Sequence, residues 1–271
     1  MHLPGGDDDV ALAVRVIGPP LDERAVPTAV MAHGAGSGAG FVVRAFGGPL
    51  VAAGWRLVAY DLRGHGGSTP VSASGRLRIA DHAADMLSVA RRTGAVLLGG
   101  VSLGAHAAVS AAATRIASGQ RLDAVLLVMP AWTGEPDQVA AANVLQAEEL
   151  ERAGVGSALD RIRRAYPGWV ADELAGSWPG HDQQAFAAVL RALGRSRAPG
   201  LAELTGLRVP AAVVAMLEDP MHPASVAQQW AKALPMAALR LVTQQEVAAD
   251  RAALGREALS ALAEAAATGS R

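Results

Sequence analysis

The segment that most constrains the fold is Gly100-Val101-Ser102-Leu103-Gly104, which follows the apolar run Ala95–Gly99 and precedes an alanine-rich helical segment. A strand that leads through Gly-x-Ser-x-Gly into a helix places the serine on a sharp turn, with its side chain clear of the backbone. The positions two residues before and after that serine must be small, and here both are glycine. The segment therefore predicts a buried strand, a tight turn at Ser102 and a packed helix.

Short apolar runs alternate with helical patterns along most of the chain. Strands are expected at 10–17, 29–32, 55–60, 95–99, 124–129, 209–217 and 239–243, and helices at 41–53, 80–92, 223–233 and 250–267. The run Ala124–Met129 is continuously apolar, as is typical of a strand that is covered on both faces. Strands that alternate with helices favour an α/β fold with a mostly parallel sheet and right-handed crossovers.

The alternation stops between Pro130 and Arg208, where helical segments at 138–153 and 183–193 follow each other without a strand. Five of the ten aromatic residues of the chain lie here: Trp132, Tyr166, Trp169, Trp178 and Phe186. We interpret residues 131–208 as a helical cap inserted after the strand that ends near Met129. Residues 1–130 and 209–271 would then form the core domain.

Composition excludes several classes of function. The formal net charge of −1 gives no basis for binding nucleic acid, and no basic run indicates a membrane surface. Cysteine is absent, so a thiol nucleophile and a cysteine-based zinc site are excluded. The histidines show no His-x-x-x-His spacing, and the glycine-rich stretch from His33 to Gly40 lacks the features of a P-loop or dinucleotide fingerprint. We therefore expect neither a metal nor a cofactor.

Two features bear on localisation. The first nine residues lack the basic region and apolar core of a signal peptide. The run Ala95–Ala113 is free of charged residues over a length that could cross a bilayer, but the turn at Ser102 explains it better as a buried strand and a packed helix. We expect a cytoplasmic protein.

Four motifs occur in one order along the chain: His33-Gly34 after an early strand, the glycine-rich loop Asp61–Ser68, the turn at Ser102, and Asp219-Pro220-Met221-His222-Pro223 after a late strand. With these motifs the chain resembles the α/β-hydrolase fold superfamily over nearly its whole length. The resemblance implies an α/β-hydrolase fold and a serine hydrolase that acts on a small ester, thioester or lactone.

The resemblance also implies roles for individual residues. Ser102 would be the nucleophile, the backbone N–H groups of Leu103 and Ala35 would form the oxyanion hole, and Asp219 would be the acid of the triad. We expect His33, Trp132 and Trp169 at the substrate, because small-molecule sites are mostly apolar with a few convergent polar groups. We also expect His33 to support the oxyanion loop through hydrogen bonding.

The expected general base is missing from its usual place. The family order is Ser, then Asp or Glu, then His after the last strand. In this chain histidine occurs at 2, 33, 65, 82, 106, 181 and 222, and the loop expected after the last strand is Gln244–Ala249, which contains none. In subtilisin, loss of the base costs about 10⁶ in turnover. We favour His222 as a displaced base. The alternatives are Glu246, from the loop after the last strand, and His181, from the cap.

Three functions therefore stay open for this chain. The first is a serine hydrolase with a non-standard or missing general base. The second is a homologue that binds a small apolar ligand or performs an isomerase- or lyase-type step. The third is a degenerate hydrolase that serves as an interaction partner. The expected partner is a small molecule, and the sequence indicates neither its identity nor the oligomeric state.

Overall fold

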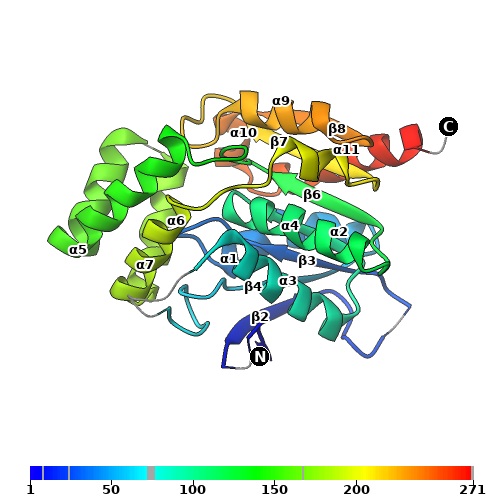
Figure 1. Ribbon diagram of the computed structural model, residues 1–271, viewed down its shortest axis with the longest axis horizontal. Coiled ribbons are helices and arrows are strands. Elements are labelled where there is room, and N and C mark those ends of the chain that lie inside the picture. Colours follow the sequence, from blue (N-terminus) through cyan, green and yellow to red (C-terminus); the bar gives the residue numbers. More distant parts are fainter. Residues whose placement is uncertain (8, 24, 72–76, 167, 270–271) are drawn as a thin grey trace.

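The computed structural model describes residues 1–7, 9–23, 25–71, 77–166 and 168–269. Within these ranges eight strands form one sheet in the order β1-β2-β4-β3-β5-β6-β7-β8 (Figure 1). The strands are β1 (His2–Pro4), β2 (Ala11–Ile17), β3 (Thr28–Ala32), β4 (Arg56–Tyr60), β5 (Leu97–Val101), β6 (Ala124–Val128), β7 (Ala211–Met216) and β8 (Ala237–Val242). β1 and β2 are antiparallel to their neighbours, and all other pairs are parallel. The predicted mostly parallel α/β sheet is confirmed.

Helices connect the parallel strands. They are α1 (Ala39–Val42), α2 (Gly48–Ala52), α3 (Ile79–Thr93), α4 (Leu103–Ala117), α5 (Gln138–Ala165), α6 (Trp169–Ser177), α7 (Gln183–Leu193), α8 (Leu201–Thr205), α9 (Ala224–Ala233), α10 (Gln244–Ala249) and α11 (Ala253–Gly269). A π-helical turn, Val43–Gly47, joins α1 to α2, and a 3₁₀ turn, Trp178–Gly180, follows α6.

Three elements differ from the sequence-based expectations. The helix expected at 41–53 is instead the succession of α1, the π-helical turn and α2. The helix expected at 138–153 continues to Ala165 and changes direction at Gly154, whose φ of 78° is not helical. The segment Gln244–Ala249, expected to be a loop, is helix α10. A capping box explains this helix, because the Thr243 and Glu246 side chains satisfy each other's backbone N–H groups.

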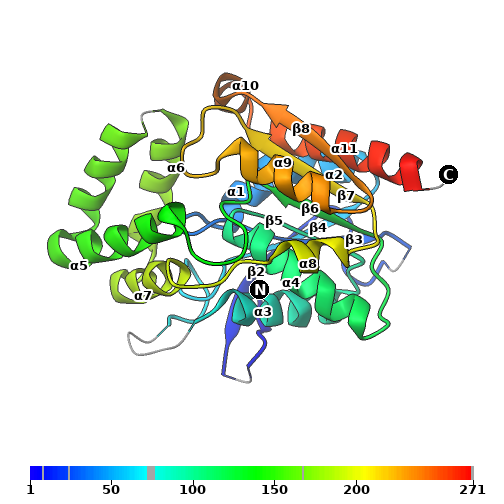
Figure 2. The ribbon, with the colours of Figure 1, turned by 45° about the horizontal axis from the view of Figure 1, so that its top comes forward.

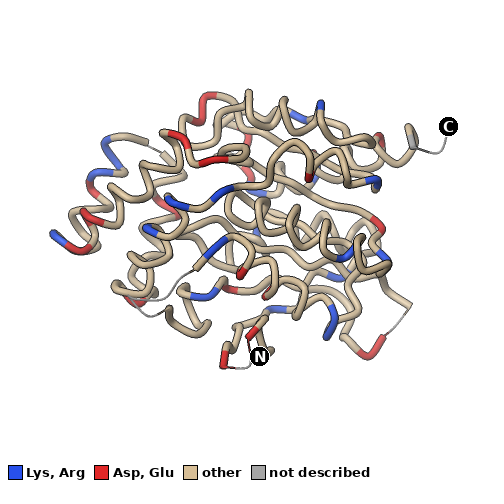
Figure 3. The backbone as a smooth tube through the Cα atoms, in the orientation of Figure 1, with Lys and Arg blue, Asp and Glu red and all other residues tan. Residues whose placement is uncertain are grey.

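The core lies on both faces of the sheet because side chains alternate along each strand. In β3, Val30 and Ala32 pack on the face that carries α3, α4 and α9, whereas Ala29 and Met31 pack on the face that carries α1, α2 and α11 (Figure 2). Charged residues lie mainly on the outer helices and loops, and the central strands are almost free of them (Figure 3). No helix in the described residues is long and apolar enough to cross a membrane.

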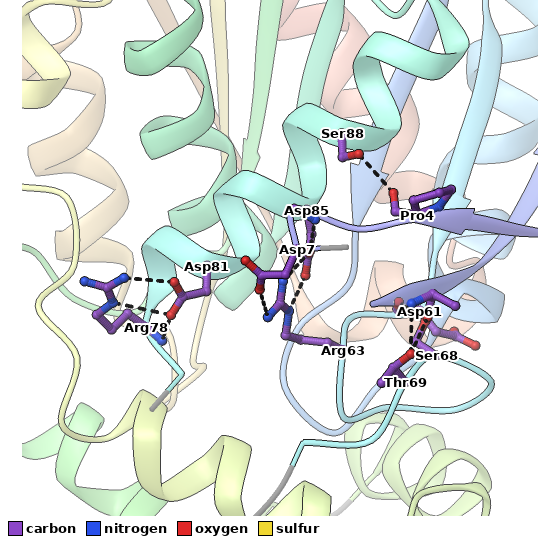
Figure 4. Close-up of polar contacts among 12 residues, drawn as sticks. Pro4, Asp7, Asp61, Arg63, Ser68, Thr69, Arg78, Asp81, Asp85 and Ser88 are labelled. Atoms are coloured by element: carbon purple, nitrogen blue, oxygen red, sulfur yellow. Dashed lines mark hydrogen bonds and ion pairs between the residues drawn. The ribbon is translucent and has the colours of Figure 1, made fainter. Parts of the chain in front are cut away.

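The glycine-rich loop after β4 is fixed by buried polar contacts. The Arg63 guanidinium donates to both carboxylate oxygens of Asp85 on α3, at 2.6 and 2.5 Å, and to Asp7 near the N-terminus (Figure 4). The Asp61 carboxylate accepts from the N–H of Ala39 at 2.8 Å, which caps the start of α1, and from the N–H of Gly67. This loop therefore joins three parts of the core.

Helices α5, α6 and α7 form a layer to one side of the sheet, between β6 and β7 in the chain (Figure 1). We call this layer, residues 138–166 and 168–193 with the turns between its helices, the helical insertion. It has its own apolar cluster, which includes Leu150, Ile162, Trp178 and Phe186. The division of the chain into a separate cap and core domain stays a prediction.

Candidate active site

Ser102 lies on a strained turn between β5 and α4. Its φ of 54° and ψ of −114° fall outside the regions that non-glycine residues normally adopt. The flanking glycines are required by close packing. A Cβ on Gly100 would lie 2.4 Å from the carbonyl carbon of Gly104, and a Cβ on Gly104 would lie 2.3 Å from the carbonyl oxygen of Ala32. The turn therefore holds the Ser102 side chain away from the strand that precedes it.

The turn after β3, residues 33–36, passes beside Ser102. A Cβ on Gly34 would lie 3.1 Å from Ser102 Cβ and 3.7 Å from Ser102 Oγ. The Ala35 N–H has no hydrogen-bond partner among the described residues. Leu103 is the first residue of α4, where a backbone N–H has no partner within the helix. Both N–H groups thus belong to backbone segments that adjoin Ser102, the turn after β3 and the first residue of α4.

Asp219 and His222 form a hydrogen-bonded pair on the loop after β7. His222 Nδ1 lies 2.7 Å from Asp219 Oδ2, and Asp219 Oδ1 accepts from the backbone N–H groups of Met221 and His222 at 2.9 and 3.3 Å. Burial raises the pKa of the Asp219 carboxyl, but the His222 imidazole and the two N–H groups outweigh burial, so the pKa is lowered. The ionised carboxylate assigns the proton of neutral His222 to Nδ1 and leaves Nε2 as an acceptor.

Ser102, Asp219 and His222 line one cavity of about 380 Å³. The remaining wall is mostly apolar and comes from both the sheet and the helical insertion, and it includes Phe41, Met129, Trp132, Tyr166, Trp169, Leu174, Trp178 and Met216. Neither Lys nor Arg is among the described residues that line the cavity. Its acidic residues are Asp219 and Glu173, and Arg44 binds both carboxylate oxygens of Glu173 at 2.7 and 2.6 Å from outside the cavity.

The structure does not bring His33 into this cavity, in contrast to its expected place among the substrate-binding residues. Its Nδ1 lies 2.7 Å from the carbonyl oxygen of Gly34, and its Nε2 accepts from the Leu62 N–H at 2.9 Å. Complete burial lowers the pKa of His33 to about 4. With both ring nitrogens engaged, His33 supports the turn from behind. Trp132 and Trp169, the other two expected substrate contacts, do line the cavity.

Glu246 is not placed to replace the missing histidine. It is exposed on α10, and its carboxylate accepts from the Thr243 N–H and hydroxyl at 2.7 and 2.8 Å. These bonds lower the pKa of Glu246, whereas a carboxylate base would need a raised pKa. Just after α10, the Arg251 guanidinium lies 4.5 Å from the ring centroid of Trp169. The segment after β8 therefore contacts the helical insertion and supplies no base.

Two other buried histidines, His106 and His65, accept from backbone N–H groups. His106 Nε2 accepts from the Ala131 N–H at 3.2 Å beside the Trp132 ring. His65 Nε2 accepts from the Gly36 N–H at 3.0 Å. Neither residue lines the cavity. In the described ranges, no group of three or more His, Cys, Asp and Glu side chains could hold a metal ion.

Sequence reasoning missed one polar strip of the cavity wall. Gln138, Asn143 and Gln146 all reach the cavity from α5, together with Val139 and Ala142. Offsets of three, four and seven residues from Val139 place Ala142, Asn143 and Gln146 on one helix face, and Gln138 lies at its N-terminal end. That spacing is visible in the sequence, but it indicates a shared face without showing what the face covers.

A mostly parallel sheet with a serine on a strained strand–helix turn defines a protein with the α/β-hydrolase fold. The chain also matches the sequence profile of the alpha/beta hydrolase family over residues 29–252. It belongs to that family.

Solved structures with the same fold cover nearly the whole chain at low identity. An enol-lactonase from Burkholderia xenovorans LB400 is 22% identical, with 90% of each chain covered and a TM-score of 0.68. A structure described with the carboxylesterases of Nitrososphaera gargenis is 16% identical, covers 100% of this chain and 99% of its own, and has a TM-score of 0.76. An esterase from Thermogutta terrifontis is 17% identical, with 90% and 88% covered and a TM-score of 0.69. A search of curated protein sequences finds no match.

Proposed function

We propose that this protein is a serine hydrolase of small esters, thioesters or lactones, in which the acid and the base both come from the loop after β7. The observation that carries the proposal is the 2.7 Å contact between His222 Nδ1 and Asp219 Oδ2, on a wall of the cavity that Ser102 also lines. A serine hydroxyl needs a base to remove its proton, and the acid normally orients that base. Here His222 would replace the histidine that the family places after the last strand.

The proposed reaction uses side chains that line the cavity and two backbone N–H groups beside it. His222 Nε2 takes the Ser102 proton as Oγ bonds to the substrate carbonyl carbon, and the carbonyl electron pair moves onto oxygen. The N–H groups of Ala35 and Leu103 stabilise that oxyanion, and such donors are commonly worth about 3 kcal/mol each. Collapse breaks the bond to the leaving alcohol or thiol, which takes the proton from His222. Water then attacks the acyl-enzyme by the same route and releases the acid.

The cavity favours an uncharged substrate. Its wall is largely aromatic and aliphatic, and its volume of about 380 Å³ suits a small molecule. Among the described lining residues, Asp219 and Glu173 are acidic and none is Lys or Arg. The amide groups of Gln138, Asn143 and Gln146 offer polar partners for a carbonyl or hydroxyl group. The helical insertion acts in this proposal as the cap that covers the substrate. The similarity to structures described as an esterase and an enol-lactonase fits this class of reaction.

Labelling with a fluorophosphonate probe tests the proposal. The wild-type protein is expected to label, Ser102→Ala to lose labelling, and His222→Gln to label about 10²-fold or more slowly. His2→Gln, an exposed histidine on β1, is the matched control and should label at the wild-type rate. Equal labelling of wild type and Ser102→Ala, or none in either, would overturn the assignment of Ser102. An unchanged rate in His222→Gln would overturn the displaced base.

A second function, ligand binding or a non-hydrolytic step without an acyl-enzyme, is favoured by one observation. Among the described residues, the Ser102 hydroxyl has no hydrogen-bond partner, so no hydrogen bond joins it to His222. In that case the cavity still binds a small apolar ligand and Ser102→Ala retains the affinity. An uncharged fluorescent probe such as N-phenyl-1-naphthylamine, titrated into unlabelled wild type and unlabelled Ser102→Ala, separates the two functions when it is compared with the labelling result.

A further inference from the structure

Three histidine rings connect the turn beside Ser102 to the helical insertion. The His33 and His65 ring centroids are 5.0 Å apart, and those of His65 and His181 are 4.9 Å apart, both in edge-to-face geometry. His33 belongs to the turn after β3, His65 to the glycine-rich loop after β4, and His181 to the segment between α6 and α7. Only His181 of these three comes from the helical insertion.

Hydrogen bonds from this row of rings fix the peptide groups of Gly36. The Gly36 N–H donates to His65 Nε2 at 3.0 Å, and the Gly36 carbonyl oxygen lies 3.4 Å from His181 Nε2. His181 Nδ1 accepts from the Gly66 N–H at 2.9 Å. Because Nδ1 accepts, the proton of neutral His181 is on Nε2 and points to the Gly36 carbonyl. His181 thereby joins the turn at Gly36 to the loop at Gly66.

The helical insertion also packs directly on this turn. Gly36 has a φ of +79°, and a Cβ on it would lie 2.5 Å from Trp178 Nε1 and 3.0 Å from Phe186 Cζ. The Phe186 ring centroid lies 5.3 Å from that of His65 and 5.1 Å from that of His181. The backbone conformation at Gly36 is therefore formed in contact with residues of the insertion and leaves no room for a side chain.

We propose that His181 is a positioning residue, which holds the Ala35 N–H in register with Ser102 through its hydrogen bonds to Gly36 and Gly66. The inference rests on the proposed function, because it assigns the Ala35 N–H to the oxyanion. Ala35 immediately precedes Gly36, so a rotation of the Gly36 peptide changes the direction of the neighbouring N–H. The helical insertion then has two tasks, to cover the substrate and to complete the oxyanion hole.

The expected effect is on turnover more than on substrate binding. Oxyanion donors must lie within about 2.7–3.1 Å of the developing charge, and a displacement of about 1 Å can cost roughly 10²-fold in rate. The donor meets its charged partner only in the transition state, so its loss lowers kcat and leaves KM nearly unchanged. His181 itself does not line the cavity and would not be in contact with the substrate.

Two substitutions separate positioning from simple ring packing, with p-nitrophenyl acetate as the assay substrate. His181→Asn keeps an acceptor for the Gly66 N–H but loses the ring, whereas His181→Phe keeps the ring and loses both hydrogen bonds. We expect kcat to fall roughly 10- to 100-fold in His181→Phe, by less in His181→Asn, with KM within about twofold in both. Gln184→Ala, an exposed position in the first turn of α7, is the control. The opposite order of kcat, or a rise in KM alone, would overturn the proposal.

A second measurement does not depend on catalysis. Amide hydrogen exchange of the peptide that spans residues 33–41 should be faster in His181→Phe than in wild type and in Gln184→Ala, because the turn has lost its restraint. Unchanged exchange would overturn the inference even if kcat fell. Exchange could be faster in His181→Phe while labelling of the wild type does not depend on Ser102. His181 would then restrain the turn at Gly36, but the proposed function and the effect of His181 on kcat would both be overturned.

Discussion

Acidification from pH 7.5 to pH 5.0 should destabilise this protein strongly, because its core holds neutral histidines. Burial lowers the pKa of His33 to about 4 and those of His82 and His106 to about 3. The unfolded chain binds these protons near pH 6.5, well before the folded protein does. The contribution of these neutral histidines to the free energy of unfolding is therefore fully present above pH 6.5. It is lost as the pH falls from about 6.5 towards the folded-state pKa values of about 4 and 3.

The magnitude follows from the difference in pKa. At pH 5.0 each of the three histidines is protonated in the unfolded chain and still neutral in the folded protein, which costs about 2 kcal/mol per group. The three together amount to about 6 kcal/mol, compared with a typical free energy of unfolding of about 5–15 kcal/mol. His65 adds to this loss, because burial also lowers its pKa well below 6.5. The pH range isolates the histidines, since carboxylates such as Asp219, whose pKa is lowered, titrate below it.

Urea denaturation followed by circular dichroism at the two pH values measures this loss. For a slope of about 3 kcal/mol/M, the midpoint should fall by about 2 M at pH 5.0. His82→Leu removes one titrating group and should reduce the pH-dependent loss by about 2 kcal/mol. Met86→Leu, a buried change on the same helix without a titrating group, should leave the loss unchanged. A midpoint that is the same at both pH values would refute the reasoning.

Three further substitutions test other parts of the structure. Gly104→Ala should destabilise the protein by about 1–3 kcal/mol or more, because its Cβ would lie 2.3 Å from a carbonyl oxygen of β3; an unchanged urea midpoint would contradict this close approach. Arg63→Leu leaves the fully buried Asp85 carboxylate without its arginine and should lower the free energy of unfolding by about 3–5 kcal/mol, measured by thermal or urea unfolding. A decrease below about 1 kcal/mol would argue against the buried ion pair. Glu173→Gln leaves Arg44 unpaired beside the cavity and should raise the ratio of activity on a p-nitrophenyl hemisuccinate to that on the butyrate roughly fivefold, from about 1 kcal/mol of Coulomb energy. An unchanged ratio would show that the acidic wall does not select uncharged substrates.

The fold could be predicted from the sequence where short segments of the chain determine it. The turn at Ser102 demands small residues two positions away on each side, and Gly100 and Gly104 meet that demand because backbone atoms lie within 3 Å of where their side chains would be. The alternation of strands and helices predicted the parallel order of the central sheet, which the structure confirms. The prediction was wrong where capping determines whether a helix forms. At α10, the capping box between Thr243 and Glu246 starts a helix in place of the expected loop.

The candidate site was only partly predictable, because its contacts join distant segments. The sequence placed Asp219 and His222 on one loop, but the hydrogen bond between their side chains depends on the shape of the turn. The pairing of Glu173 with Arg44 spans 129 residues and has no local signature. His33 illustrates the converse: its motif predicts a place near Ser102, but only the structure shows that both ring nitrogens face backbone groups away from the cavity. The roles of Ser102, Asp219 and His222 stay predictions until labelling is done.

The spacing of Asp219 and His222 has a consequence for how such a pair assembles. The contact closes a loop of only three residues, so little chain entropy is lost when it forms. A histidine placed after the last strand would reach its acid only once the C-terminal part of the chain had docked on the sheet. In this protein the acid and its imidazole are instead brought together by one turn, and α10 joins that turn through the hydrogen bond from the Gln244 side chain to the Glu218 carbonyl oxygen.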